Sequence, residues 1–580
     1  MIKKLMGCIR DNKKHTILTP LLMLGEVGLE CTIPMITADL INSIENNAGM
    51  PNILRYGALL VLMALCSMSC GILSGWFAAS ASAGFARNLR HDLFAKVQSF
   101  SFSNIDKFST ASLVTRLTTD VTNVQNAFMM IIRIAVRSPL MLIFAIIMSI
   151  RMGGPIALVF LLVVPILGFG LLFIAKKAMP LFKAVFKKYD RLNNSVQENV
   201  KGMRVVKSFV RENYEKQKFA AASEDVRNDF TKVEKLLAIN NPLMLLAIYI
   251  CMILIPLFSA KVIISSGGSN MQVGDLASLI TYAMQILMSL MMLSMIFVMI
   301  TISGEAARRI VEVLDTEATL TNPAQPITEV ANGSIDFENV SFKYNPDAAA
   351  YALADVNLHI PSGATVGILG GTGSSKTTLI QLISRLYDVS KGCVKVGGVD
   401  VRDYDMEALR NQVAVVLQKN VLFSGTIAEN LRWGNPNATD EELVLACKQA
   451  QADGFIMANP EGYKRYIEQG GANVSGGQKQ RLCIARALLK KPKILILDDS
   501  TSAVDTQTDA LIRKAFREEL PDVTKLIIAQ RVASIQDADL ILVMDNGRVA
   551  AQGTHETLLA TNEIYREVYT SQTKGGEDDA

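Results

Sequence analysis

Charged residues are scarce in this sequence. Only 19% of its 580 residues are Asp, Glu, Lys or Arg, the formal net charge is +4, and 50% of the residues are hydrophobic. A small net charge argues against nucleic acid as a partner, because nucleic-acid binding needs a face rich in Lys and Arg. A soluble enzyme of this size would carry fewer apolar residues. The apolar residues of this chain concentrate before residue 302, and an ordinary α/β composition follows residue 330. This division indicates a membrane domain and a separate soluble domain.

The cysteines form no metal-binding pattern. Cys66 and Cys70 would share a helix face, but no histidine or third cysteine lies near them in the sequence. Free cysteine packs as a small hydrophobic residue, so we interpret the cysteines as structural. The others are Cys8, Cys31, Cys251, Cys393, Cys447 and Cys483.

No small-residue cleavage site follows the basic N-terminal segment MIKKLMGCIRDNKK and its apolar run. We therefore expect a retained membrane span rather than a signal peptide. About six apolar segments have roughly the length needed to cross a bilayer. They lie near residues 17–42, 56–80, 128–150, 155–176, 237–264 and 276–302.

Positive charge is distributed unevenly between the connections of these segments. Lys and Arg concentrate at the N-terminus and in the connections 87–125 and 177–235, whereas the other loops are short and poor in positive charge. The positive-inside bias predicts that both termini and both long connections are cytoplasmic. The connections are polar and helix-forming, so we expect the membrane helices to project beyond the lipid.

Four ionisable residues interrupt the spans. Glu26 and Glu30 lie in the first span and Arg133 and Arg137 in the third, each pair four residues apart and therefore on one helix face. At 1.5 Å per residue, Glu30 is ~24 Å and Arg137 ~21 Å from the outer end of its span, so the depths match. We expect an interhelical ladder of ion pairs, because lone charges in lipid are costly. The alternative is that these residues line the transport path and contact substrate.

The sixth span carries methionines at helical period. Flexible, polarizable thioethers suit a surface that accepts varied apolar ligands, which makes these residues a candidate substrate path. Ordinary helix packing is an equally good interpretation. The candidate path residues are Met284, Met288, Met292, Met295 and Met299, and Met291 completes the methionine stripe.

The pattern changes to short strands and turns after residue 333. ATVGILGGTGSSKTTLIQLISRLYD predicts a strand, a glycine-rich loop and a helix, and the loop matches a phosphate-binding P-loop except that Ser375 replaces its last glycine. Backbone N–H groups and the helix N-terminus would hold phosphates, Lys376 would reach the β- and γ-phosphates, and the Thr377 hydroxyl would bind Mg²⁺. The candidate ATP-binding residues here are Gly370, Gly371, Thr372, Gly373, Ser374, Ser375, Lys376, Thr377 and Thr378.

Further motifs follow in order. FENVSFKY ends in Tyr344, VVLQKNVLF places Gln418 after a strand, NVSGGQKQRLCIARALLKK opens a helix, KILILDDSTSAVD ends a strand in two acids, and LIIAQRVASI follows another strand. With this set, the sequence resembles the ATP-binding cassette (ABC) transporters, specifically exporters with membrane spans fused ahead of the cassette. MRVVKSFVRENYEKQKF is similar to their second coupling segment, and the resemblance covers nearly the whole chain.

The resemblance implies an α-helical transmembrane domain of six spans followed by an α/β P-loop nucleotide-binding domain. The expected parts are a membrane domain at 1–310, a linker at 311–332, a nucleotide-binding domain at 333–575 and a polar tail at 576–580, with coupling segments near 105–115 and 203–219. In this family two cassettes meet head to tail, so the P-loop of one faces the SGGQ helix of the other and a half-length chain must dimerise.

The resemblance also implies residue roles. Tyr344 would stack on adenine, and Gln418 would sense Mg²⁺ and relay to the membrane helices. Asp498 would hold Mg²⁺ together with Thr377 and Gln418. The signature segment for the partner's site comprises Val474, Ser475, Gly476, Gly477 and Gln478, with valine where leucine is usual, and the D-loop at the dimer seam includes Ser502, Ala503 and Asp505.

Two catalytic positions depart from the family pattern. Asp499 stands where a glutamate polarises the attacking water, and the missing methylene shortens its reach by ~1.5 Å. Gln530 stands where a histidine contacts the γ-phosphate, and an amide cannot carry positive charge. Both departures fall in the site built on this chain's own P-loop, whereas Ser475 to Gln478 are intact. The sequence therefore predicts a slow, degenerate ATP site in one half of a heterodimeric, multidrug-type exporter.

The expected partner is a second ABC half-transporter that supplies Glu and His for the competent site. The expected cofactors are ATP and Mg²⁺, and the expected substrates are hydrophobic drugs or lipids in the cell membrane. Two alternatives stay open: a homodimeric exporter with two slow sites, and an ATP-gated channel or regulatory half.

Overall fold

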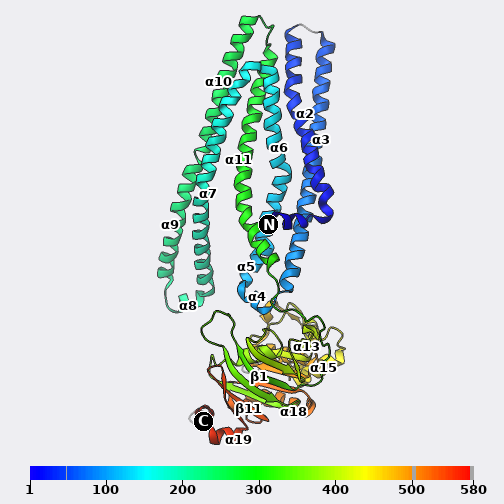
Figure 1. Cartoon of the computed structure of the whole chain (residues 1–580), viewed down its shortest axis with the longest axis vertical. Coiled ribbons are helices and arrows are strands. Elements are labelled where there is room, and N and C mark those ends of the chain that lie inside the picture. The colour runs from blue at the N-terminus through cyan, green and yellow to red at the C-terminus, as the bar shows by residue number, and fades with distance from the viewer. Residues whose placement is uncertain (47–48, 500–503, 575–580) are drawn as a thin grey trace. The chain divides into compact units, whose positions relative to one another are not determined.

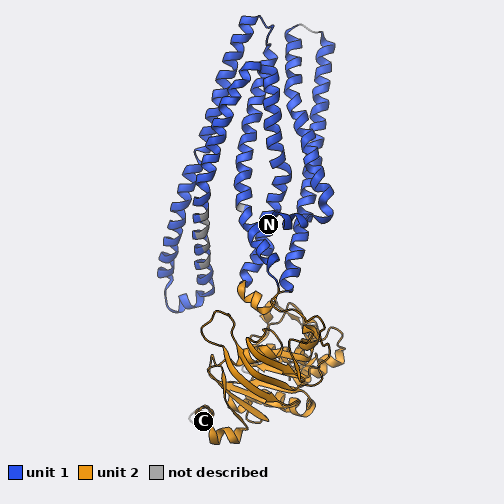
Figure 2. Cartoon of the chain, viewed as in Figure 1, with its two compact units in different colours: residues 1–99, 109–317 blue, residues 100–108, 318–580 orange. Residues whose placement is uncertain are grey.

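The structure, a computed structural model, describes residues 1–46, 49–499 and 504–574. It divides into two compact units (Figure 2): a helical unit of Met1–Ser99 and Ser109–Glu317, and an α/β unit of Phe100–Phe108 and Ala318–Ala580. The division after Glu317 falls inside the expected linker. The short segment 100–108 groups with the α/β unit although helices of the other unit flank it in sequence.

Long helices form the helical unit, because its sequence has long apolar runs (Figure 1). Helix α3, with 49 residues, is ~74 Å long, far more than the ~30 Å of a bilayer core. The helices are α1 (Ile2–Gly7), α2 (Lys13–Glu45), α3 (Met50–Gln98), α5 (Thr110–Thr115), α6 (Val121–Gly153), α7 (Leu158–Lys201), α8 (Met203–Ser208), α9 (Glu212–Leu237), α10 (Asn240–Ser266) and α11 (Val273–Asp315).

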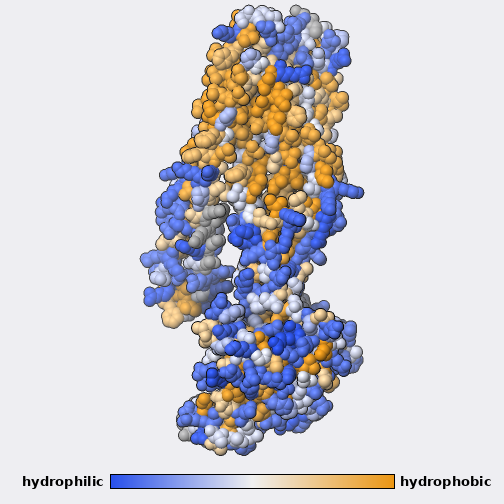
Figure 3. Space-filling view, viewed as in Figure 1, coloured by the Kyte–Doolittle hydropathy of each residue, from blue (hydrophilic) through white to orange (hydrophobic). Residues whose placement is uncertain are grey.

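Five helical segments in the described part of the chain are long and apolar enough to cross a membrane. One of them, Thr110–Phe182, includes α6 and the first part of α7, and so contains both of the expected spans at 128–150 and 155–176. Six spans remain a prediction. Figure 3 shows a band of apolar side chains across the helical unit, bordered by polar zones.

Small residues let these helices approach closely. A Cβ atom at Gly274 of α11 would lie 2.3 Å from the carbonyl oxygen of Ala38 in α2, and the Gly274 N–H donates to Asn42 Oδ1 at 2.8 Å. The Tyr282 hydroxyl, fully buried, donates to the carbonyl oxygen of Cys31 at 2.7 Å. These contacts fix the N-terminal part of α11 against α2.

The α/β unit contains two main sheets. A four-stranded antiparallel sheet has the order β2-β1-β4-β5, and a six-stranded sheet has the order β12-β11-β3-β10-β9-β6, in which only β12 is antiparallel. Every residue of β9 and β10 is buried, as central parallel strands require. The strands are β1 (Ile335–Phe342), β2 (Leu353–Ile360), β3 (Thr365–Gly370), β4 (Lys391–Val396), β5 (Val399–Asp400), β6 (Val413–Val416), β9 (Ile494–Asp498), β10 (Thr524–Ile528), β11 (Leu540–Asp545) and β12 (Arg548–Gly553).

Helices flank these sheets, and a small hairpin of β7 (Gly425–Thr426) and β8 (Tyr466–Ile467) accompanies them. The helices are α4 (Phe102–Lys107), α12 (Lys376–Ile383), α13 (Met406–Gln412), α14 (Ile427–Arg432), α15 (Asp440–Gln449), α16 (Asp453–Met457), α17 (Gly476–Leu488), α18 (Thr506–Glu519), α19 (His555–Thr561) and α20 (Glu563–Lys574).

Candidate nucleotide-binding site

Four loops with predicted site residues leave the same edge of the six-stranded sheet. Strands β6, β9, β10 and β3 are parallel neighbours, so their carboxyl ends meet. The P-loop follows β3, Asp498 ends β9, Gln418 follows β6 and Gln530 follows β10. Open α/β sheets bind ligands at this edge. The topology thus brings residues more than 150 positions apart in the sequence into one site.

The P-loop has a left-handed residue where the family pattern has glycine. Ser375 adopts φ 70° and ψ 26° directly before α12. A side chain in this conformation costs roughly 1–2 kcal/mol, which glycine avoids. The sequence departure at Ser375 is therefore also a point of backbone strain.

Lys376 lies against the carbonyls of its own loop. Its Nζ donates to the carbonyl oxygens of Gly370 and Gly371, both at 2.8 Å. Burial lowers the pKa of Lys376, and the nearby carboxylates of Asp498 and Asp499 oppose that shift. The side chain is long enough to exchange these carbonyls for phosphate oxygens.

Thr377 and Asp498 form the pair that could hold a cation. The Thr377 hydroxyl donates to Asp498 Oδ2 at 3.0 Å. Burial raises the pKa of Asp498, the neighbouring Asp499 adds to the rise, and the Thr377 hydrogen bond and Lys376 counteract it. A cation at this point would compensate the cost of burying the charge. Mg²⁺ usually takes one or two carboxylates beside phosphates and water, so Thr377 and Asp498 could hold it when a nucleotide is bound.

The side-chain amides of Gln418 and Gln530 converge on one carboxylate oxygen of Asp499. Asp499 Oδ2 accepts a hydrogen bond from Gln530 Nε2 at 2.8 Å and a longer one from Gln418 Nε2 at 3.4 Å. Asp499 also has a left-handed φ of 50° and is only 9% exposed. The second carboxylate is therefore held by two amides beside the P-loop.

The side chain of Tyr344 packs against α12, the helix that follows the P-loop. Its hydroxyl bonds with Thr378 Oγ1 and donates to Gln381 Oε1, both at 3.0 Å, and its ring stays 50% exposed. The ring meets that of Tyr387 edge-on, with centroids 5.2 Å apart. Stacking of adenine on this exposed ring stays a prediction.

The signature helix has an ordered start. Ser475 caps α17 by accepting from the N–H of Gln478, whose side chain accepts in turn from the Ser475 N–H. Gly476 is exposed and Gly477 is half-buried, so the end of the helix is open to a ligand, and Val474 is partly buried before it. Asp505 caps α18 in the same way, accepting from the N–H of Thr508 at 2.9 Å, whereas Ser502 and Ala503 lie outside the described residues.

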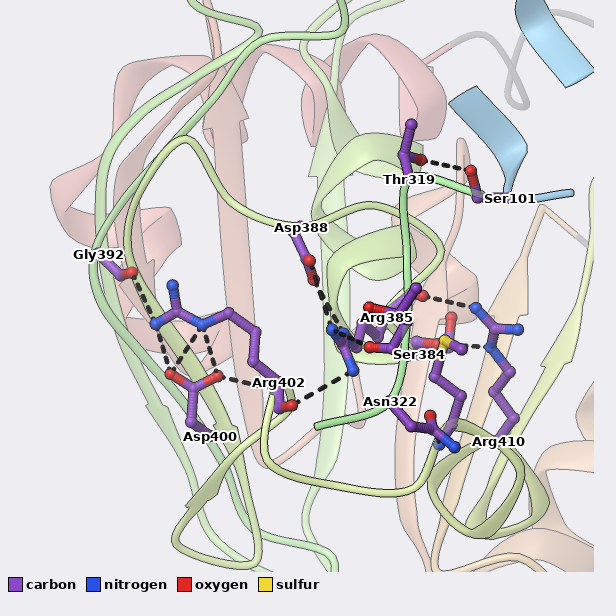
Figure 4. A network of polar contacts seen from close by, with 12 residues as sticks. Ser101, Thr319, Asn322, Ser384, Arg385, Asp388, Gly392, Asp400, Arg402 and Arg410 are labelled. Atoms are coloured by element: carbon purple, nitrogen blue, oxygen red, sulfur yellow. Dashed lines mark hydrogen bonds and ion pairs between the residues drawn. The ribbon is translucent and has the colours of Figure 1, made fainter. Parts of the chain in front are cut away.

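A network around Arg385 ties the P-loop helix to the linker (Figure 4). Arg385, 5% exposed at the end of α12, donates to the carbonyl oxygen of Thr321 at 3.2 Å and to Asp388 at 2.9 Å. Thr319 bonds to Ser101, just before α4. Neither Arg385 nor Thr319 belongs to a recognisable motif, so sequence reasoning missed them.

Tyr387 was missed as well. Its hydroxyl donates to Asp106 of α4 at 2.7 Å, and its ring also contacts Phe102 of α4. Burial and this hydrogen bond raise the pKa of Tyr387. Tyr387 therefore contacts both the base-stacking candidate Tyr344 and the first of the expected coupling segments.

The intramembrane charges are only partly paired. Arg137 Nη2 donates to both carboxylate oxygens of Glu30 at 2.8 and 2.7 Å, and lies 3.7 Å from Glu26 Oε1. Arg133, by contrast, makes no ion pair within the described residues. One rung of the expected ladder is thus present, and the second is not.

The methionines of α11 differ in exposure. Met288, Met292 and Met295 are 55%, 42% and 60% exposed, and Met284, Met291 and Met299 are partly buried. Met288, Met292 and Met295 are therefore only partly covered by this chain.

Family models match both units. One described as the ABC transporter transmembrane region matches residues 16–291, and one described as ABC transporter matches residues 353–502. The chain is also 37% identical over 552 residues to an uncharacterized ABC transporter ATP-binding protein, YfiB of Bacillus subtilis, with 95% of each chain covered. The chain belongs to the ABC transporter family.

Other relatives of this ABC transporter chain agree. A fatty acid ABC transporter ATP-binding/permease protein of Mycobacterium tuberculosis is 33% identical over 482 residues, covering 82% of this chain and 75% of that protein. The solved structure of a bacterial Atm1-family ABC exporter with ATP bound matches with a TM-score of 0.82 at 25% identity, over 97% of this chain and 98% of that one.

The chain therefore combines a multi-span membrane domain with an ATPase domain in the fold of Atm1-type exporters, and it couples ATP hydrolysis to transport. ABC exporters act as dimers, so this chain is one half of a transporter.

Proposed function

We propose that this chain is the degenerate half of a heterodimeric exporter that moves hydrophobic or amphipathic compounds, drugs or lipids, across the cell membrane. The observation that supports this most strongly is the arrangement of Asp499 and Gln530. Both residues deviate from the family's catalytic pattern, and they hydrogen-bond to each other at 2.8 Å.

This contact explains slow hydrolysis in physical terms. The short carboxylate starts ~1.5 Å back from the position a glutamate would reach. The Gln530 amide then holds it toward β10 instead of leaving it to polarise a water. Because a positioned general base contributes roughly 10²–10⁴-fold, its loss leaves a site that binds ATP and turns over slowly.

ATP and Mg²⁺ binding would be preserved in the same site. Lys376 would reach the phosphates, Tyr344 would stack on adenine, and Thr377, Asp498 and Gln418 would surround the Mg²⁺. Such a site acts as a clamp that stays closed while the other site cycles.

The intact signature segment supports a difference in hydrolysis rate between the two ATP sites of the dimer. The capped helix start at Ser475 offers Gly476 and Gly477 to a γ-phosphate without side-chain interference. A partner half-transporter with Glu and His in its own site would use this segment as part of a competent site. Closure of the two cassettes would then pass through segments 105–115 and 203–219 to the membrane helices, with both termini in the cytoplasm.

The exposed methionines Met288, Met292 and Met295 support an apolar substrate. The relative named as a fatty acid transporter supports amphiphiles within that class.

The test is the composition of the complex. The tagged chain, expressed in its native host, should co-purify in equal amounts with a second ABC half-transporter with Glu and His at the positions of Asp499 and Gln530. Recovery of a homodimer only would favour the alternative with two slow sites. Single-channel currents across a bilayer would favour the gated-channel alternative.

A further inference from the structure

Beside the ion pair of Glu30 and Arg137, the helical unit has a groove of about 610 Å³. It lies between α2, α3 and α6, and its polar lining comes from Glu26, Glu30, Ser67 and Arg133. Met68 and Ile72 of α3 also line the groove and are 55% and 63% exposed. The apolar rim of the groove is therefore accessible from the outer surface of the helical unit.

Two glycines of α3 make the space for the charges. A Cβ atom at Gly71 would lie 3.2–3.3 Å from the carboxylate of Glu26, and one at Gly75 would lie 3.7 Å from the guanidinium of Arg133. The glycines are four residues apart, one helical turn or ~6 Å along the axis. Any larger side chain at these two positions would fill the groove where the charges face it.

The charges in the groove are separated rather than neutralised. Arg137 is shared by Glu30 and Glu26, which leaves one negative charge in excess, and Glu26 Oε2 is buried with no hydrogen-bond partner in the described structure. Glu26 as a residue is 8% exposed. Arg133, which has no ion pair within the described chain, supplies one positive charge about a turn away. An unpartnered buried carboxylate oxygen costs several kcal/mol in an apolar medium, so a ligand that supplies a donor is strongly favoured.

We propose that this groove binds the headgroup of a zwitterionic amphiphile, with a primary ammonium at Glu26 and a phosphate at Arg133. A phosphoethanolamine headgroup has this charge order, and its acyl chains would leave past Met68 and Ile72 into the lipid. The ammonium has three donors, enough for Glu26 Oε2 and Glu30 together. This names the substrate class of the proposed exporter and rests on that proposal.

The alternative is that Glu26 and Arg133 form a structural pair after a change of rotamer. In that case the groove would show no headgroup preference, and the swapped variant with Glu26→Arg and Arg133→Glu would behave like the original chain.

The test uses tryptophan fluorescence of the full-length chain in nanodiscs. The chain has two tryptophans, and Trp76 adjoins Gly75, so a Trp433→Phe background isolates the reporter. Lipids with brominated chains quench nearby tryptophan. At equal mole fraction, phosphatidylethanolamine should quench Trp76 with at least about tenfold higher apparent affinity than phosphatidylglycerol or phosphatidylcholine, because only its ammonium can donate to Glu26.

Glu26→Gln should remove the preference for phosphatidylethanolamine over phosphatidylglycerol, and Arg133→Met should weaken the binding of both lipids. Gly75→Val should abolish selective quenching by filling the groove, whereas Gly57→Val is a matched control on the same helix, because a Cβ there meets nothing within 4 Å. Equal quenching by all three lipids in the unmutated groove would overturn the proposal. It would also be overturned if free phosphoethanolamine, which lacks acyl chains, competed for the groove as well as the lipid does. Quenching is measured without ATP, so selective binding without ATP-driven lipid movement would reject the exporter proposal and leave the groove assignment intact.

Discussion

Lengthening one side chain should restore hydrolysis at this chain's own ATP site. Asp499→Glu adds a methylene and moves the carboxylate ~1.5 Å outward from the end of β9. The carboxylate would then move away from the position at which it now accepts the 2.8 Å hydrogen bond from Gln530 Nε2. A displacement near 1 Å changes catalysis by about 10²-fold, so turnover should rise ~10²-fold.

The assay is steady-state Mg-ATP hydrolysis by the purified chain alone, where no competent partner site masks the change. Adding Gln530→His to Asp499→Glu should raise turnover further, because a histidine can bring positive charge to the γ-phosphate. Asp440→Glu on the exposed start of α15 is the matched control, and it should change nothing. Unaltered turnover in Asp499→Glu would refute the argument that reach limits this site.

Other expectations follow from single contacts. Ser375→Gly should relieve roughly 1 kcal/mol of left-handed strain that is already present in the nucleotide-free loop. The free energy of unfolding of the chain should rise by about that amount in urea denaturation, and a lower value would contradict the strain argument. Burial raises the pKa of Asp498, so the ionised carboxylate lowers the stability of the folded chain at neutral pH, and this cost is absent below the ordinary pKa of a carboxyl group. Asp498→Asn should therefore raise the melting temperature of the nucleotide-free chain by a few degrees at neutral pH. The same substitution should give no gain near pH 3. Tyr387→Phe should leave ATP affinity intact but reduce substrate-stimulated hydrolysis, since it removes the 2.7 Å bond to Asp106 on α4; unchanged stimulation would exclude a coupling role. Exchanging Glu30 and Arg137 should rescue the stability loss of either single charge removal, and failure to rescue would reject the ion pair.

The nucleotide site could be read from the sequence because its residues belong to ordered local motifs. The P-loop, Gln418, Asp499 and Gln530 each follow a strand, and parallel strands bring their carboxyl ends together. Sequence reasoning recognised Ser375 as a departure, but its strained φ is a property of the folded loop. The division between a membrane half and an α/β half was equally visible in the hydropathy.

The remaining contacts depend on long-range packing that no motif marks. Tyr387 meets Asp106 from almost 300 residues away, and Arg385 reaches the linker only because α12 ends beside it. Likewise, equal spacing on two helices predicted a ladder of ion pairs, whereas Arg133 has no ion pair among the residues that the structure describes and lies beside Gly75 instead. Spacing along one helix cannot determine how two helices face each other.

The most direct test of the central claim is Mg-ATP turnover of this chain alone and after co-expression with its partner half-transporter. The account predicts slow turnover alone, a many-fold rise with the partner, and loss of that rise when the partner's catalytic glutamate is replaced by glutamine. Brisk turnover by the chain alone would show that Asp499 does activate water, and the asymmetric exporter would then be the wrong account of this protein.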